Sequence, residues 1–446
     1  MTQDLTKGNP TKLILIFVLP LILANVFQQL HGLVDAFIIG NNLGVGPLAA
    51  VGSTGGIVFL IFGFGMGASN GLGIVTAQKF GSGNMKALRR SVATSIVVGT
   101  AIALALTSIS VPFARLFLEL QRTPVEIIDE AYTFLIILMS GTIIGVFFNL
   151  IASLIRALGD SKTPLYIMIV AVVTNLVLLY VFVVLLGMGV GAAATASLIG
   201  QFISVMLGAI YIRKKLPIIR LTAEDWKITK HDIIEHSRAA LPMGASTSVI
   251  AVGVIVVQYA LNGLGHVAVA AFTAAARIDH VAMMPLNSFG AAMGTYVAQN
   301  YGAGRIDRVK EGVLKCTIIA VAFSVVFGAI KFIFGYTFAG FFVSGDVYAS
   351  EVQHYAQIFL RVNGSMYAIL AVLLIVRFSL QGLGKNFAPA LSSVLELIMR
   401  VFAALVLARS LGFFGICLSN PLAWLGAAIP LVIIYFTTIK KMEKKF

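Results

Sequence analysis

The sequence predicts an all-α polytopic membrane protein, with twelve transmembrane helices in two six-helix bundles related by pseudo-twofold symmetry. Its 446 residues are 59% hydrophobic and only 11% charged, a balance typical of membrane proteins. Its apolar stretches reach the length of about 20 residues that a helix needs to cross a bilayer. Helices are expected because backbone groups in lipid must pair within their own segment, and the sequence lacks the alternating pattern of a barrel.

Twelve apolar stretches, separated by short polar segments, define the expected spans. The first stretch follows a short polar start and lacks the small-residue cleavage site of a signal peptide, so we expect a membrane helix there. Pro20, Pro242 and Pro285 fall inside expected spans and can kink them. The spans are expected at residues 13–39, 53–78, 91–113, 132–155, 165–186, 191–212, 239–261, 268–297, 313–336, 356–380, 387–410 and 415–438.

The distribution of Lys and Arg predicts the orientation of the chain. Basic residues cluster at every second connection, from Lys7 and Lys12 to the tail at 440–445, whereas the connections 41–52 and 187–190 have none. The positive-inside rule therefore predicts that both termini are cytoplasmic. Because the net charge of +14 is spread over these short clusters, it reflects membrane topology, and no nucleic-acid partner is expected.

The longest internal polar segment, residues 213–238, separates two halves that repeat each other. GIVTAQKFGSGN (73–84) aligns with GTYVAQNYGAGR (294–305), and RALGDSKTP (156–164) aligns with QGLGKNFAP (381–389). Duplication of this kind is a recurrent architecture of transporters. The predicted domains are an N-terminal six-helix bundle at 1–212, a cytoplasmic connecting loop at 213–238 and a C-terminal six-helix bundle at 239–446.

Other function classes lack their sequence signatures. The six His and two Cys form no HExxH, GxSxG or CxxC motif, so we expect no metal site, no disulfide and no membrane-embedded lipid-modifying enzyme. The glycines of GFGMGASNGLG (63–73) lack the strand and the GK[ST] of a phosphate loop and are explained by close helix packing. A passive channel would need a repeated ring that two unlike halves do not supply. Of the function classes considered, this leaves a carrier that uses no cofactor.

The stretch QQLHGLVD (28–35) places polar side chains inside the first expected span. Gln28, His31 and Asp35 are three and four residues apart, so they share one helix face. Asp35 is the one acid well inside a span of the first half, and such acids are functional by default. This face can hold a proton network or supply oxygens to Na⁺. The alternative is that Asp35 is merely hydrated and that His31 is a packed histidine.

The second half carries more ionisable residues inside its expected spans. Arg277 and Asp279 are two residues apart and do not face each other on a helix, so each needs its own partner. Glu396 and Arg400 are four residues apart, which favours an ion pair within one helix. Arg361 and Arg377 complete this set, and a broad basic cavity lined by Arg277, Arg361 and Arg377 would favour a flippase.

Several of these motifs together resemble the MATE (multidrug and toxic compound extrusion) transporters, a group whose wider relatives include lipid-linked oligosaccharide flippases. The resemblance rests on LPLILANVFQQLHGLVDAFIIG (19–40), on the paired AQKFGSG and AQNYGAG, and on RALGDSKTP, and it covers nearly the whole chain. It implies two six-helix bundles with a central cavity that opens alternately to each side. It also implies efflux of organic, often cationic, compounds in exchange for H⁺ or Na⁺.

The resemblance also implies a cation-coupling site. Asp35 matches the acid of the first span, Asn175 in TNLVLLY matches an Asn of the fifth, and Thr195 in GAAATAS matches a Thr of the sixth. With His31 assisting, these are the predicted cation-coupling residues. The chain departs from the pattern at Leu179, where many relatives have an acid, and this missing carboxylate favours H⁺ over Na⁺.

A substrate cavity is predicted around four polar residues. The seventh span has Gln258 where some sodium-coupled relatives have an acid. The complete expected set is Gln28, Gln258, Arg277 and Asp279.

The predicted function is therefore secondary-active multidrug efflux by alternating access in a bacterial plasma membrane. The alternative is a flippase for a lipid-linked or peptide substrate. The expected partners are small organic molecules and the lipid bilayer, and the expected state is a monomer.

Overall fold

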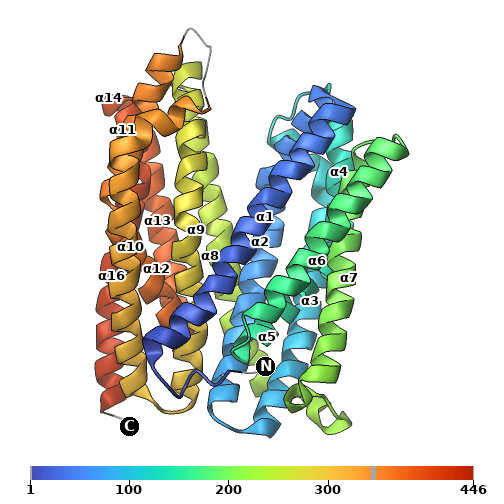
Figure 1. Cartoon of the computed structure of the whole chain (residues 1–446), viewed down its shortest axis with the longest axis vertical. Coiled ribbons are helices and arrows are strands. Elements are labelled where there is room, and N and C mark those ends of the chain that lie inside the picture. The colour runs from blue at the N-terminus through green and yellow to red at the C-terminus, as the bar shows by residue number, and fades with distance from the viewer. Residues whose placement is uncertain (1–2, 343–347, 445–446) are drawn as a thin grey trace. The chain divides into compact units, whose positions relative to one another are not determined.

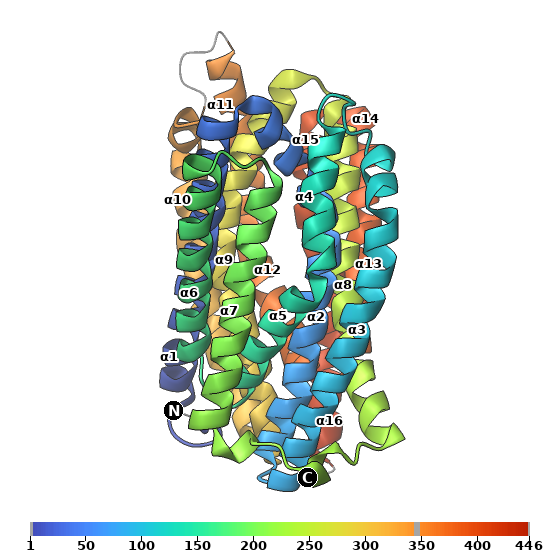
Figure 2. The same cartoon turned by 90° about the vertical axis from the view of Figure 1, so that its right-hand side faces the viewer.

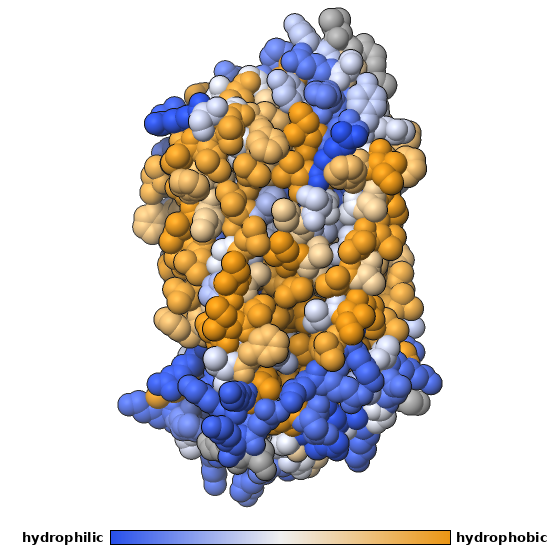
Figure 3. Space-filling model, turned by 90° about the vertical axis from the view of Figure 1, so that its left-hand side faces the viewer, coloured by the Kyte–Doolittle hydropathy of each residue, from blue (hydrophilic) through white to orange (hydrophobic). Residues whose placement is uncertain are grey.

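The computed structural model describes residues 3–342 and 348–444, and long helices dominate both ranges (Figure 1). Within these ranges, ten helices are long and apolar enough to cross a membrane, and two bent helix pairs raise this number to twelve. The prediction of an all-α polytopic membrane protein is confirmed. On the face in Figure 3, apolar side chains form a band with hydrophilic side chains at both ends, as a bilayer-spanning surface requires.

The helices of the first half follow the predicted spans but extend beyond them. Their bounds are α1 Pro10–Leu43, α2 Val45–Gly81, α3 Met85–Leu120, α4 Ile128–Ser140, α5 Thr142–Ala157, α6 Lys162–Leu179 with a π-helical extension Tyr180–Leu185, and α7 Gly191–Lys215. Short 3₁₀ turns follow at Pro217–Ile219 and Ala223–Trp226.

The second half repeats this order of elements. Its helices are α8 Lys230–Asn262, α9 His266–Gly302, α10 Ile306–Gly340, α11 Ala349–Ser365, α12 Tyr367–Gly382, α13 Phe387–Phe402 with a π-helical extension Ala403–Leu407, α14 Ala408–Leu411, α15 Phe413–Cys417 and α16 Ser419–Glu443.

The duplication seen in the sequence extends to local backbone geometry. Gly44 and Gly265 precede equivalent helices with φ values of 95° and 91°, and Gly159 and Gly384 have φ values of 83° and 74°. Only glycine adopts such a backbone at little cost. At Gly159 a side chain is doubly excluded, because a Cβ atom would lie 1.9 Å from the carbonyl oxygen of Gln3. The two halves therefore share turns as well as helices.

Two predicted spans, 132–155 and 356–380, are broken in the structure. The axis bends by 50° between α4 and α5 and by 51° between α11 and α12. Gly141 lies at the first bend, where a Cβ atom would come within 2.3 Å of the Leu198 side chain. Hydropathy did not reveal these bends, because both arms of each pair are apolar.

The chain divides into two compact units. One unit comprises the chain up to Lys7 together with Leu19–Ser248, and the other comprises Gly8–Val18 together with the chain from Val249 onward. Both α1 and α8, the first long helix of each half, are thus shared between the units. The domain boundaries predicted from the sequence stay a prediction.

Part of the connecting segment 213–238 is fastened to the first unit. Arg89 of α3 lies 3.5 Å from Asp225, and Lys79 of α2 donates to Glu235 at 2.7 Å. Burial would raise the pKa of Asp225, but hydrogen bonds from Thr222 and the nearby Arg89 guanidinium lower this pKa below its usual value. The segment between the halves is therefore an ordered, charge-paired connection.

Candidate functional site

The polar face of α1 meets α6 and α7 in one hydrogen-bonded cluster, which we name the Asp35 cluster: His31, Asp35, Asn175 and Ser197. Asn175 Nδ2 donates to Asp35 Oδ1 at 3.0 Å and lies 3.3 Å from Oδ2. The same nitrogen lies 3.3 Å from His31 Nδ1, and the Ser197 hydroxyl donates to Asn175 Oδ1 at 3.1 Å. Asn175 is therefore the central residue, with its amide nitrogen toward α1 and its oxygen toward α7.

The local sequence explains this geometry. His31 and Asp35 are four residues apart on α1, and His31 Nδ1 lies 3.4 Å from Asp35 Oδ1. Helices α6 and α7 lie side by side (Figure 2). Gly200 lets α7 pack closely against α6 beside Asn175, because a Cβ atom there would lie 2.6 Å from the carbonyl oxygen of Ala171. The three helices thus meet at a point where the polar residues of the cluster lie next to a small residue, Gly200, that permits close packing.

One helical turn beyond the cluster, the surroundings become apolar. Leu179 follows Asn175 by four residues, and Ile39 follows Asp35 by four; both are buried in one cluster with Val183 of the α6 extension. The position where many relatives were expected to carry an acid is thus filled by a packed side chain. Asp35 is left as the one carboxylate of the cluster.

Asp35 is accessible and has no fixed positive partner. Its side chain and that of His31 are each 22% exposed. Within residues 3–342 and 348–444, its ion-pair contact is with His31, and no Lys or Arg lies within salt-bridge distance of its carboxylate. A carboxylate in a membrane span without a cationic partner is unfavourable unless it is hydrated, protonated or bound to a cation. The cluster can therefore take up a proton or a small cation.

The amide orientation of Asn175 bears on which cation fits. Na⁺ as a hard cation requires oxygen ligands. In the structure, Asn175 presents its NH₂ group to Asp35, while its oxygen accepts from Ser197. Asp35 thus supplies the oxygens on the α1 side. No group of three or more His, Cys, Asp or Glu that could hold a metal ion occurs in the described part of the chain.

The other predicted residues of the first half lie outside this hydrogen-bond network. Thr195 donates to the carbonyl oxygen of Gly191 in its own helix at 2.8 Å. Ser197, two residues further along α7, provides the hydroxyl that contacts Asn175. Gln28 has an exposed side chain. The resemblance did not single out Ser197, which lies two residues from Thr195 on the same helix, and the coupling role of Thr195 stays a prediction.

The second-half residues predicted for the substrate cavity are dispersed. Gln258 donates to Asn262 within α8 at 2.8 Å, and Arg277 on α9 is exposed. Asp279 is buried, and its side chain contacts residues of the second unit. Their shared role in a substrate cavity stays a prediction.

Asp279 belongs to a buried group, which we name the Lys331 triad: Asp279, Lys331 and Tyr367. The ammonium of Lys331 lies 2.5 Å from Asp279 Oδ1, and the Tyr367 hydroxyl donates to the same oxygen at 2.6 Å. The ammonium also lies 3.3 Å from the centre of the Tyr367 ring, which is a cation–π contact. Asp279 thus has the partner it needed, although the sequence did not identify that partner.

A second buried charge group links α12 and α13. Glu396 forms the predicted pair with Arg400 across one helical turn at 3.7 Å, and it also pairs with Arg377 of α12. Arg377 is therefore engaged within the second unit. The basic cavity that would favour a flippase loses one of its three expected arginines.

Comparison with known proteins points to one family. The model of the MatE family matches residues 20–181 and 242–406. The probable multidrug resistance protein YoeA of Bacillus subtilis (strain 168) is 26% identical over 447 residues, covering 98% of this chain and 95% of YoeA. The probable multidrug resistance protein NorM of Thermotoga maritima is 25% identical, and the alignment covers 95% of this chain and 89% of NorM.

Solved structures agree on the fold. The structure described as "Crystal structure of MATE in complex with MaL6" has a TM-score of 0.91 at 21% identity and covers 99% of both chains. The one described as "Outward-facing conformation of a multidrug resistance MATE family transporter of the MOP superfamily" has a TM-score of 0.90 at 20% identity, again covering 99% of both chains. At these identities the likeness establishes the fold alone.

Proposed function

Because this chain belongs to the MatE family, we propose that it exports small organic molecules across a membrane in exchange for a cation bound at Asp35. Membership makes the chain a multi-pass membrane transporter of small molecules and not an enzyme. Ion coupling without a cofactor is general in this family. The proposal concerns the exchange mechanism, the coupling residues and the choice of ion.

One observation carries the proposal: an accessible carboxylate joins α1 to α6 through the Asn175 amide and lacks a Lys or Arg partner among the described residues. Side chains, more than close backbone packing, hold the part of α1 from Leu19 onward against the rest of the first unit. A change in the charge of Asp35 therefore changes a bond that positions α1. Coupling requires such a link, since a cation shifts an equilibrium between two conformations only by its differential affinity for them.

We propose H⁺ as the coupling ion. In the structure, the carboxylate accepts both contacts from Asn175. On protonation, Asp35 loses its charge, and the charge-assisted bond to Asn175 becomes an ordinary, weaker one. His31 lies within reach of the same oxygen and can exchange a proton with it. Because position 179 is a leucine, it offers no second carboxylate that could coordinate Na⁺ beside Asp35.

Substrate and cation would then favour opposite conformations of the first unit. The relatives' names point to multidrug substrates, which we extend to organic cations for this chain. We place both termini in the cytoplasm on the distribution of basic residues, and we propose that the transporter acts as a monomer in a bacterial plasma membrane.

The deciding experiment is dye efflux from proteoliposomes that contain the purified protein, with a pH gradient or a Na⁺ gradient imposed separately. We expect the pH gradient to drive efflux, the Na⁺ gradient to fail, and Asp35→Asn to abolish gradient-driven transport. The matched control is Asp129→Asn at the exposed start of α4, where the carboxylate pairs with Arg115 outside the cluster. Wild-type transport by the Asp35→Asn protein would refute coupling through Asp35.

A further inference from the structure

Arg361 on α11 is a charged residue that the transport mechanism does not use. Its side chain is exposed although it lies in a predicted span. Its Nε donates to the carbonyl oxygen of Phe332 at 3.3 Å, and its guanidinium lies 5.2 Å from the centre of the Phe332 ring. No ion pair with a carboxylate is formed by Arg361 in the described part of the structure. Most of its five donors therefore remain available.

The position of Arg361 along α11 suits the level of lipid headgroups. The first residues of this helix include Ser350, Glu351, Gln353 and His354, after which the sequence becomes apolar. At 1.5 Å per residue, Arg361 lies about 10 Å beyond His354 along the helix axis. A long arginine side chain reaches back toward the interface from such a depth.

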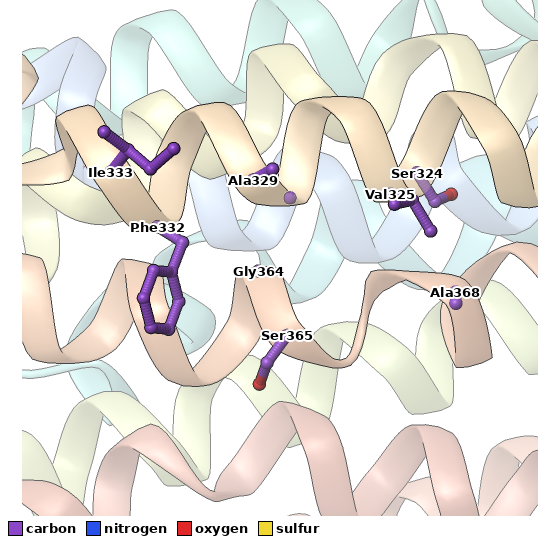
Figure 4. Close-up of a pocket in the computed structure, with 9 residues that line it drawn as sticks. Ser324, Val325, Ala329, Phe332, Ile333, Gly364, Ser365 and Ala368 are labelled. Atoms are coloured by element: carbon purple, nitrogen blue, oxygen red, sulfur yellow. The ribbon is translucent and has the colours of Figure 1, made fainter.

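A pocket lies immediately beyond Arg361, between α10 and the bend that joins α11 to α12. It has a volume of about 280 Å³ and an opening at the protein surface. Figure 4 shows Phe332 projecting from α10 across to α11, with Gly364 and Ser365 on the facing helix. The residues that line it include Val325, Gly328, Ala329, Phe332, Gly364 and Ser365.

The guanidinium and the pocket share one helix face. Gly364 and Ser365 follow Arg361 by three and four residues, which places them one turn further along the same side of α11. Phe332 contacts Arg361 and also lines the pocket. Gly328 and Gly364 allow the close helix crossing beside it, because a Cβ atom on Gly328 would lie 2.4 Å from the Gly364 carbonyl oxygen.

We propose that this face of the second unit binds an anionic phospholipid, with its phosphate at Arg361 and one acyl chain in the pocket. Arginine is the residue best suited to hold a phosphate in two parallel hydrogen bonds. The pocket is mostly apolar and lies on the side of Arg361 toward the membrane interior, where the chain of such a lipid would run. Its volume of about 280 Å³ lies just below the range of small-molecule sites, which begins at about 300 Å³, and suits one acyl chain better than a whole drug.

The charge balance supports an anionic ligand. An exposed arginine in a membrane span is unfavourable without a carboxylate partner, and a bound phosphate would compensate its charge. The buried Arg377 shows the alternative solution in the same unit, because it pairs with Glu396. Arg361 has no such partner among the described residues, and the headgroup of an anionic phospholipid would supply the missing negative charge.

Native mass spectrometry of the purified, delipidated protein tests the site. The protein would be titrated with phosphatidylglycerol, with phosphatidylcholine of the same acyl chains, and with inorganic phosphate. We expect one phosphatidylglycerol to be retained with about tenfold preference over phosphatidylcholine, because phosphatidylcholine has the same phosphate but adds a quaternary ammonium close to the Arg361 guanidinium. Inorganic phosphate should compete poorly because it has no acyl chain.

Substitutions test the phosphate contact and the acyl-chain pocket separately. Arg361→Gln should abolish the preference for phosphatidylglycerol, and Ala329→Phe, which fills the pocket from an exposed position, should weaken retention of both lipids. Arg409→Gln, an exposed arginine elsewhere in the same unit, should change neither. A preference that survives in R361Q would overturn the proposal, and so would inorganic phosphate competing as well as the lipid. If A329F fails to fold, short-chain phosphatidylglycerol tests the pocket instead, and retention equal to that of the long-chain lipid contradicts it.

Discussion

The Asp35 cluster and the Lys331 triad both centre on an aspartate inside a membrane helix, yet they solve the problem of its charge differently. Asp279 is buried and carries its cation permanently, in the form of the Lys331 ammonium 2.5 Å away. Asp35 is partly exposed, and an amide and an imidazole meet it instead of a Lys or Arg. A carboxylate that is paired with a fixed ammonium group does not require a second cation, whereas a carboxylate without such a partner can exchange a cation with solvent. The comparison predicts a structural role for the triad and an exchange role for the cluster.

The largest effect should come from breaking the triad. Lys331→Met leaves Asp279 buried without its cation, and removal of one partner of a buried ion pair destabilises a protein by about 3–5 kcal/mol. We expect a large fall in the thermal unfolding midpoint of the detergent-solubilised protein, and recovery of most of it in Lys331→Met with Asp279→Asn. Lys315→Met, which breaks an exposed pair with Glu311, should cost less than about 1 kcal/mol. A K331M protein as stable as the K315M control would remove the contrast between the two aspartates.

A smaller effect is expected from Asn175→Ala, which sharpens the comparison at the cluster. The substitution removes the amide that joins α1 to α6, while Asp35 remains able to bind a proton. We expect about tenfold slower gradient-driven efflux, together with a loss of stability of about 1.5–3 kcal/mol, which is the contribution of one charge-assisted hydrogen bond. The matched control is Asn42→Ala, because Asn42 donates only to a carbonyl oxygen of its own helix. Equal efflux rates for the two variants would argue against Asn175 as the link.

The smallest effect should separate Ser197 from Thr195. Ser197→Ala removes the donor to the Asn175 oxygen, an ordinary hydrogen bond worth about 0.5–1.5 kcal/mol, so efflux should slow by two- to tenfold, a range set by that same energy. Thr195→Ala removes only a bond to the backbone of its own helix and should leave the rate unchanged. The efflux assay used for Asp35→Asn measures both. If T195A is the slower variant, the threonine expected from the family resemblance is the coupling residue after all.

Much of the first-half cluster was accessible to sequence reasoning, and little of the triad was. His31 and Asp35 are one turn apart, so helical periodicity alone placed them on one face. Asn175 came from the resemblance, and the structure brings it to hydrogen-bond distance of Asp35. Lys331 gave no comparable signal, because nothing in the local sequence marks which of many helices its side chain will face.

The sequence by itself determined that this chain is a duplicated, all-helical membrane transporter, because hydropathy, basic clusters and repeated motifs are properties of the chain that do not depend on contacts. The tertiary structure alone decided which polar residues meet. Asp279 with Lys331, Arg377 with Glu396, and Ser197 with Asn175 join residues from different helices. Such pairs depend on how each helix is rotated and on how it crosses its neighbours. Close approaches at glycines such as Gly200 set this geometry, and no one-dimensional pattern encodes it.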